Sequence, residues 1–282
     1  MFGDVASANV VGYQNAPAHE GDFNFMTMTF DKVGGGSTIK LSDLKVGENF
    51  IYSYVSFFNP ATGGDRKFKY DENGVCVQDN NGDFFGKFTW WTKDDLAGVG
   101  ITGEDGWYSE DDMFTPHPVQ DFEIAFGEGF YVRGQDDGDA NLLHSGEVIG
   151  EAQPLEVAEG DFNFRGNCTP TPINLSDLGG GDNFIYSYVS FFNPTTGGDR
   201  KFKYDENGVC IQDDNGDFFG KFTWWTSEDL SGVGITGEDG WYSEDDMFTP
   251  HPVQDFEINP GEGLYVRGQD DGSAYLMVPS PL

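Results

Sequence analysis

Acidic side chains crowded into glycine-rich turns are the residues of this sequence best suited to bind a ligand. Calcium takes several carboxylate and carbonyl oxygens at once, and short acidic loops supply both. Asp79, Asn81 and Asp83 alternate as at the start of an EF-hand, but Gly82 holds the fourth place and no glutamate closes the loop. Two interpretations remain open: at least one Ca²⁺ site in each half, or turns that are only solvated. The candidate metal ligands are Asp79, Asn81, Asp83, Glu104, Asp105, Asp111, Asp112, Asp213, Asn215, Asp217, Asp245 and Asp246.

Aromatic side chains form a second set of candidates, because flat rings can stack on sugars or on a neighbouring subunit. Adjacent Trp90 and Trp91 would point to opposite faces of one strand, so we expect one in the core and the other exposed. A core role for all of these side chains is the alternative. The candidate ligand or interface aromatics are Trp91, Trp107, Tyr108, Trp225, Trp241 and Tyr242.

Catalytic motifs are poorly represented. Gly98-x-Gly100-x-x-Gly103 matches a dinucleotide fingerprint by letter, but the acidic pair that follows it would repel phosphate. His117 and its copy His251 lie between prolines, and the chain has neither a G-x-S-x-G nor an H-E-x-x-H pattern. We therefore expect a protein that is not an enzyme and that uses no cofactor, with Ca²⁺ the one ligand ion under consideration.

Cysteine usage points the same way. The chain has three cysteines, Cys76, Cys168 and Cys210, so at least one thiol is unpaired within a monomer. Cys76 stands between two valines just after a turn, which predicts a small buried strand residue. The sequence does not indicate a disulfide framework.

An internal duplication positions these residues. Residues 47–139 occur again as 181–273, at a constant offset of 134 and with eleven differences. A unit of this length is a domain rather than a short solenoid repeat. We expect a first domain over 1–146 and a duplicate over 147–282. Within the first domain, the segment 1–20 is a candidate donor strand for a neighbour's sheet, with pairing to its own sheet as the alternative.

Short apolar alternations separated by turns predict an all-β fold. In the stretch 50–58 both strand faces are apolar, as in a strand within a core. Asn73-Gly74 is a strong hairpin signal between 66–70 and 75–77, and Thr92 to Leu96 predicts a short capped helical turn. Seven or eight short strands in each half predict two tandem β-sandwiches or small barrels.

The charge limits the partners. The formal net charge is −34, with 49 acidic residues against 15 Lys plus Arg. Such a chain repels nucleic-acid phosphates and anionic lipid, and no apolar run is long enough to span a bilayer. Packing against copies of itself requires screening by salt or neutralisation by cations. Adaptation to saline water is the alternative explanation for the charge.

The start of the chain and the ends of the repeat carry a resemblance. The segment Asn9-Val10-Val11-Gly12-Tyr13-Gln14-Asn15, the segment Gly127-Glu128-Gly129-Phe130-Tyr131-Val132 and the close Ser145-Gly146-Glu147-Val148 resemble a large, mostly uncharacterised set of secreted bacterial all-β proteins. The second copy retains Pro260 to Val266 but ends without S-G-E-V. The resemblance implies export and an all-β domain, and it transfers no catalytic residue.

Ala6-Ser7-Ala8 has the small-residue pattern of a signal-peptidase site, so we expect a secreted protein, extracellular or at the cell surface, with its leader absent or trimmed. Our expected function is a structural protein that assembles with itself into a filament or layer by head-to-tail contacts. The alternative is an adhesin that binds polysaccharide at two equivalent aromatic sites. An enzyme ranks third.

Overall fold

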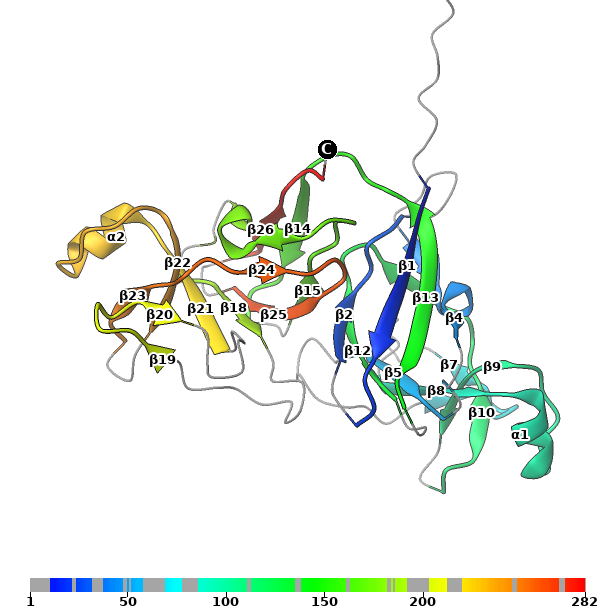
Figure 1. The fold of residues 1–282 in the computed structure, drawn as a ribbon. Helices are drawn as coiled ribbons and strands as arrows, with labels where there is room; N and C mark the ends of the chain where they lie inside the picture. Colours follow the sequence, from blue (N-terminus) through cyan, green and yellow to red (C-terminus); the bar gives the residue numbers. More distant parts are fainter. Residues whose placement is uncertain are drawn as a thin grey trace, which may run out of the picture.

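The computed structural model describes residues 11–21, 24–31, 38–47, 50, 52–57, 69–77, 86–110, 113–134, 138–160, 163–181, 184, 186–191, 203–211, 220–244, 248–268 and 272–281. Nearly all of the regular structure in this part of the chain is β-strand, as predicted (Figure 1).

The first half contains thirteen short strands within the described residues. They are β1 (Val11–Ala18), β2 (Asn24–Thr27), β3 (Thr38–Lys40), β4 (Lys45–Val46), β5 (Tyr54–Phe57), β6 (Lys69–Tyr70), β7 (Cys76–Val77), β8 (Gly86–Trp91), β9 (Gly106–Glu110), β10 (Pro116–Pro118), β11 (Glu123–Ala125), β12 (Gly129–Arg133) and β13 (Ala140–Glu147). Two short helices join them, the 3-10 helix η1 (Leu41–Asp43) and the α-helix α1 (Lys93–Gly98). The strands outnumber the seven or eight predicted, because several have only two or three residues.

The second half repeats these elements in the same order. Its strands are β14 (Gln153–Val157), β15 (Asn163–Gly166), β16 (Ile173–Asn174), β17 (Gly179–Gly180), β18 (Tyr188–Phe191), β19 (Lys203–Tyr204), β20 (Cys210–Ile211), β21 (Gly220–Trp225), β22 (Gly240–Glu244), β23 (Pro250–Pro252), β24 (Glu257–Ile258), β25 (Gly263–Arg267) and β26 (Ala274–Val278). Its helices are η2 (Leu175–Asp177) and α2 (Ser227–Gly232).

The two halves have one topology, as the duplication predicts. In the first half a three-stranded sheet has the order β1-β13-β4 and a six-stranded sheet the order β10-β9-β8-β5-β12-β2. In the second half the corresponding orders are β14-β26-β17 and β23-β22-β21-β18-β25-β15. The strand β13 runs to Glu147, one residue past the expected limit of the first domain.

Each half encloses its own core between the larger and the smaller sheet, which is a sandwich arrangement. In the first half Ala16 and Leu142 of the three-stranded sheet belong to the same buried cluster as Val55, Phe88 and Phe130 of the six-stranded sheet. The second half has the equivalent cluster. The apolar alternation read in the sequence therefore supplies the inner face of each sheet.

Two local predictions are confirmed. Strands β6 and β7 pair as a hairpin, with Lys69 opposite Val77 and Tyr70 opposite Cys76. The side chain of Thr92 caps α1 by accepting a hydrogen bond from the backbone N–H of Asp95. Such an N-cap satisfies one of the otherwise unpaired donors at the start of a helix.

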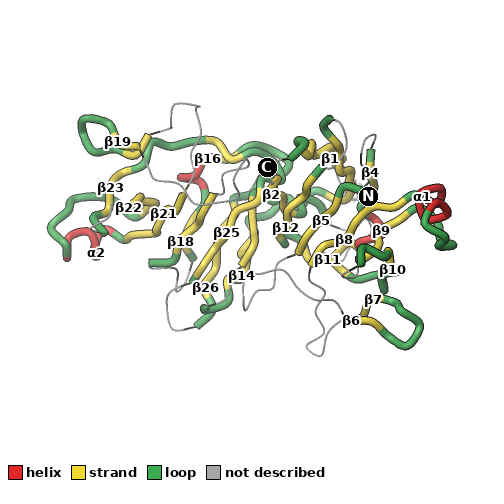
Figure 2. The backbone as a smooth tube through the Cα atoms, turned by 90° about the horizontal axis from the view of Figure 1, so that it is seen from below, coloured by secondary structure: helices red, strands yellow, loops and turns green. Residues whose placement is uncertain are grey.

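The halves pack through their edge strands β2 and β15 and the neighbouring β12 and β25. Gly129 lies against the backbone of Phe164, and its equivalent Gly263 lies against the backbone of Phe25 and Met26. The backbone N–H of Thr27 also donates to the carbonyl oxygen of Gly261 at 2.9 Å. Equivalent groups contact each other reciprocally, so the halves are related by an approximate two-fold axis. Helices α1 and α2 consequently lie at opposite ends of the molecule (Figure 2).

Candidate functional site

The six aromatic residues predicted to meet a ligand or neighbour are all buried, so the prediction of an exposed platform was wrong. Trp91, Trp107 and Tyr108 expose only 7–8% of their surface, and so do Trp225, Trp241 and Tyr242. Trp107 belongs to the main core, whereas Trp91 and Tyr108 pack with Leu96 of α1 in a smaller cluster. We expected one of Trp90 and Trp91 to be in the core and the other to be exposed. Trp91 is buried, and Trp90 is half-buried and packs against the main core.

The polar atoms of these rings are also engaged within the fold. Trp107 donates from Nε1 to the carbonyl oxygen of Leu44 at 3.2 Å, and Trp241 donates to Leu178 at 2.8 Å. The hydroxyl of Tyr108 donates to the carbonyl oxygen of Glu104 at 2.9 Å. Neither the ring faces nor the polar atoms of these side chains are left for a sugar.

Glu104 and Asp105 are the predicted metal ligands that the structure describes, and both serve the start of α1. The Lys93 ammonium bonds to both carboxylate oxygens of Glu104, at 2.9 and 3.1 Å, and this bond raises the pKa of Lys93. The backbone N–H of Lys93 donates to Asp105 at 2.7 Å. In the second half Asp239 retains the backbone contact with Ser227, while serine replaces the lysine partner of Glu238.

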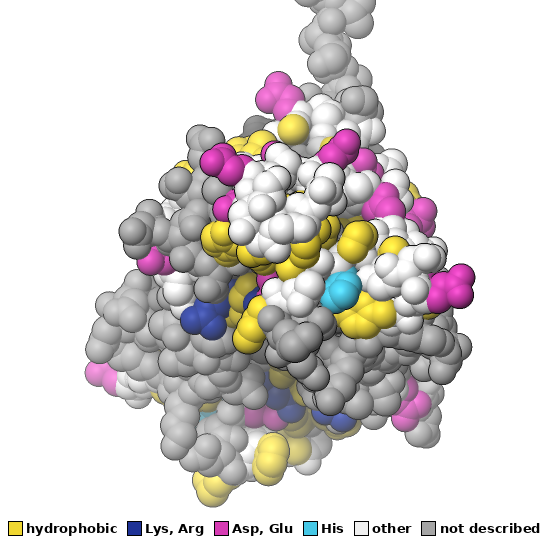
Figure 3. Space-filling model, turned by 90° about the vertical axis from the view of Figure 1, so that its left-hand side faces the viewer, with side chains coloured by type: hydrophobic (Ala, Val, Ile, Leu, Met, Phe, Trp, Pro, Cys, Tyr) yellow, Lys and Arg dark blue, Asp and Glu magenta, His cyan; other side chains and the backbone are white. Residues whose placement is uncertain are grey.

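The other predicted metal ligands lie outside the described residues: Asp79, Asn81, Asp83, Asp111, Asp112, Asp213, Asn215, Asp217, Asp245 and Asp246. Within the part of the chain that the structure describes, no three His, Cys, Asp or Glu side chains lie close enough to hold a metal. On the face shown in Figure 3, acidic side chains are spread over the surface rather than gathered in one place. Calcium binding therefore stays a prediction.

The thiols and the repeated histidines have structural surroundings. Cys76 and Cys210 are buried on β7 and β20, as predicted for Cys76, and burial raises the pKa of each thiol to about 11. Burial raises the pKa of Cys168 to about 12. These thiols are protonated at neutral pH and are not nucleophiles there. The His117 ring packs at a tilt against Tyr70, with centroids 4.6 Å apart, and its Nδ1 lies 3.1 Å from the carbonyl oxygen of Gly74.

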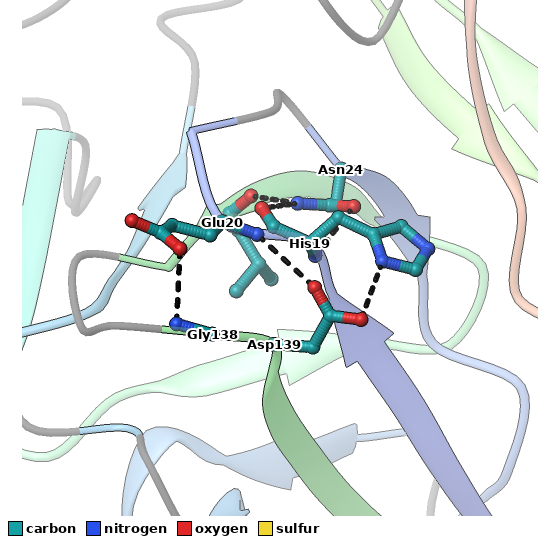
Figure 4. A network of polar contacts seen from close by, with 6 residues as sticks. His19, Glu20, Asn24, Gly138 and Asp139 are labelled. Carbon is teal, nitrogen blue, oxygen red and sulfur yellow. Dashed lines mark hydrogen bonds and ion pairs between the residues drawn. The ribbon is translucent and has the colours of Figure 1, made fainter.

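Residues 11–18 of the N-terminal segment pair with their own half as strand β1, which is the alternative to the donor-strand expectation. The pairing with β13 runs from Val11 opposite Glu147 to Ala18 opposite Ala140. A polar network fixes the end of β1 (Figure 4). Nδ1 of His19 lies 3.0 Å from a carboxylate oxygen of Asp139, and the backbone N–H of Gly138 donates to Glu20 at 2.9 Å. Residues 1–10 lie outside the described part of the chain.

A buried polar chain that is specific to the first half reaches the second half. Nε2 of His144 lies 2.8 Å from Oγ1 of Thr29, whose hydroxyl donates to Oε1 of Gln14 at 2.6 Å. The Gln14 amide in turn donates to the carbonyl oxygen of Pro260 at 2.9 Å. Thr29 uses its own proton on Gln14, so His144 must donate from Nε2 as a neutral ring. Burial lowers the pKa of His144 to about 4.

The exposed residues that sequence reasoning missed are Phe114 and its copy Phe248. Each is 75% exposed, and each has a backbone φ of +60°, in the left-handed region. Met113 beside Phe114 is 81% exposed. Tyr52 and Tyr186 also have positive φ, but their rings pack on Trp91 and Trp225. No ring contact of this kind holds Phe114 or Phe248 against another described residue.

Comparison with known proteins returned no matching family model, no matching curated protein and no matching solved structure. None of the described helices is long and apolar enough to cross a membrane.

Proposed function

We propose that this chain is a secreted, non-enzymatic structural protein that associates with copies of itself into a filament or layer outside the cell. The observation that carries the proposal is the pair Phe114 and Phe248. A large residue with positive φ costs on the order of 1–3 kcal/mol, and such strain concentrates at functional positions. Two exposed, strained phenylalanines at equivalent places provide a repeated apolar contact that a monomer does not bury.

The approximate two-fold arrangement supports assembly. The halves pack against each other through β2 and β15, which leaves the equivalent β9–β10 and β22–β23 turns in different halves of one molecule. A subunit with two like contact sites in separate places joins more than one neighbour, and contacts that do not close into a ring extend without limit. The resemblance of the chain's start and of the end of the first repeat to exported bacterial proteins supports the extracellular location.

The second candidate is the polysaccharide-binding adhesin, and the same phenylalanines favour it over the buried tryptophans. An exposed aromatic ring can stack on a sugar face. Two such rings in separate halves would bind one extended polysaccharide or two chains. Both candidates place the functional contact at Phe114 and Phe248, and they differ in the partner.

The test compares wild type with the double variant Phe114→Asn, Phe248→Asn. Asparagine tolerates positive φ better than phenylalanine, so the fold should retain or gain thermal stability. We expect wild type to form large species in high salt by light scattering and electron microscopy, and the double variant to remain small. The matched control is Val99→Asn with Val233→Asn, two apolar residues that are 55% and 56% exposed elsewhere. This control should assemble as wild type does.

A wild-type protein that stays a monodisperse monomer at every salt and Ca²⁺ concentration would rule out self-assembly. Binding to a polysaccharide panel that the phenylalanine double variant loses, without any change in particle size, would instead support the adhesin.

A further inference from the structure

Strand β1 lies at the edge of its sheet, and the hydrogen bonds of the neighbouring strand β13 show which β1 residues direct their backbone groups to the open side. It stands first in the sheet order β1-β13-β4. On β13, the backbone of Glu147 exchanges hydrogen bonds of 3.0 and 2.9 Å with Asp31, on the side away from β1. The carbonyl oxygen of Asn141 likewise accepts from Gly47 on that side. Glu147 and Asn141 therefore do not form hydrogen bonds with the β1 residues opposite them. In an antiparallel pair, such residues of β1 direct their own N–H and C=O groups away from β13, toward the free edge of the sheet.

The outward-facing residues of β1 are therefore Val11, Tyr13, Asn15 and Pro17. Their N–H and C=O groups make no hydrogen bond to any other residue that the structure describes. Only Pro17, at the end of the strand, lacks an N–H. The stretch from Val11 to Asn15 thus offers an unbroken hydrogen-bonding edge, which is the usual template for pairing with another strand.

The equivalent strand of the second half is blocked. Gln153 on β14 corresponds to Gln14, so Pro154 stands where β1 has Asn15 and provides no outward N–H. The outward carbonyl oxygen of Glu156 is occupied by the guanidinium of Arg165, at 2.8 and 3.1 Å. Proline and charged groups on an edge are common protection against association. The two halves therefore share a fold but differ in the accessibility of this edge.

Charge selects the partner for the open edge. The segment Val11–Ala18 contains no charged residue, in a chain whose formal charge is −34. Two such chains approach each other at least cost where both surfaces are uncharged. An antiparallel strand pair is also self-complementary, because the same strand can supply both sides of a two-fold contact.

We propose that β1 pairs antiparallel with β1 of a second copy of this chain, about a two-fold axis at Tyr13. This inference rests on the proposed self-association and names one contact through which it occurs. Tyr13 then lies opposite Tyr13 of the second copy, and Val11 lies opposite Asn15. These residues exchange about six backbone hydrogen bonds, and Pro17 falls outside the paired stretch. The side chain of Tyr13, 65% exposed in the single chain, gains an aromatic cross-strand partner.

Cysteine crosslinking tests the register. Directly opposite residues of such a pair have Cα atoms about 5.5 Å apart, within reach of a disulfide. Under mild oxidation, Tyr13→Cys should give covalent dimers. Asn15→Cys alone should not, because two copies of residue 15 would stand about 14 Å apart. Mixing Asn15→Cys protein with Val11→Cys protein should restore the dimer. The three natural cysteines are buried, and they stay in place in every variant.

Proline transplantation tests the role of the edge. Asn15→Pro copies the residue that the second half tolerates at the equivalent position, so the fold should persist by circular dichroism and melting. We expect it to reduce the assembled fraction in sedimentation velocity at least tenfold. The reciprocal variant, Pro154→Asn with Arg165→Met, opens β14 and should increase particle size. Arg165 corresponds to Met26 of the first half.

The outcomes separate the two proposals. Large wild-type particles that persist in Asn15→Pro, with no dimer from Tyr13→Cys, would overturn pairing through β1 and leave self-assembly in place. A wild type that never assembles would overturn the proposed function itself, and the crosslinking would then fail in every variant.

Discussion

Thr27 and Gly166 are equivalent residues of the edge strands β2 and β15, and they lie against each other. Thr27 pairs with Gly129 as Gly166 pairs with Gly263. A Cβ atom added to Gly166 would stand 2.7 Å from Cγ2 of Thr27 and 2.2 Å from the carbonyl oxygen of Glu262. The axis relating the two halves passes between these two residues, and glycine allows the backbones to approach there.

Gly263→Ala should weaken the contact between the halves. Its Cβ would stand 2.7–2.9 Å from backbone atoms of Phe25 and Met26, which cannot move aside as a side chain can. We expect a loss of about 1–3 kcal/mol in the free energy of unfolding, as for overpacked cores. Urea denaturation measures the loss, and proteolysis between β13 and β14 should become faster. In the control Gly98→Ala at the end of α1, where nothing lies within 4 Å, stability should hold or rise. Equal stability of both variants would contradict a tight contact.

His144 should make the protein sensitive to acid. Its pKa falls from 6.5 to about 4 on folding because the ring is buried, so the unfolded chain binds the proton more readily. Stability is therefore full above about pH 6.5 and declines as pH falls toward 4, by about 3 kcal/mol from this group.

The variant His144→Val with Thr29→Cys copies the second half, which has Val278 and Cys168 at these positions. The difference in unfolding free energy between wild type and variant should change across pH 4–6.5, as measured by urea titrations. The carboxylates are the same in both proteins, so their contribution to the pH dependence cancels in this difference. A constant difference would show that His144 is not titrating in this window.

Trp107→Ala with Trp241→Ala should unfold the protein rather than remove a ligand contact. Each ring is buried in its core, and truncation of a buried tryptophan costs about 3–5 kcal/mol. We expect a large fall in melting temperature, measured by circular dichroism. Phe114→Asn at its 75% exposed position serves as the contrast and should leave melting nearly unchanged. If the tryptophan double variant melted at the same temperature as wild type, the two rings would not contribute to the cores, and a role in binding at the surface would again be supported.

Calcium should raise the melting temperature more than NaCl does at matched ionic strength, if the acidic turns coordinate it. At a hundredfold excess over Kd, a ligand that binds only the folded state adds about 2.7 kcal/mol. Changing Asp111, Asp112, Asp245 and Asp246 to Asn should remove part of this gain. Glu104→Gln is the control, because Lys93 already engages that carboxylate. Equal responses to both salts would mean that the charge is only screened.

The sequence predicts where the strands lie better than it predicts which strand faces are buried by other elements. The apolar alternation in 54–57 and 86–91 predicts β5 and β8. The Asn-Gly turn predicts the β6–β7 hairpin. Alternation separates the two faces of a strand, but it does not show whether the outer face is covered. Trp91 is buried because Leu96, five residues later on α1, and Tyr108 on β9 pack on it.

Two features of the candidate sites had no signal in the residues. Phe114 adopts positive φ without the glycine or asparagine that usually marks such a backbone, so nothing in Met113-Phe114-Thr115 predicts it. The pairing of β1 with β13 joins segments more than a hundred residues apart, and Pro17 argues against a regular strand there. Both depend on tertiary structure rather than on local sequence.

The reciprocal contact between β2 with β12 and β15 with β25 has the form of a homodimer interface, but here both sides belong to one chain. The connection from Glu147 to Gln153 converts a bimolecular encounter into an intramolecular one, with an effective concentration in the millimolar range for a short linker. The two halves should therefore stay docked at any dilution of the protein. Concentration then controls only the contacts between separate molecules.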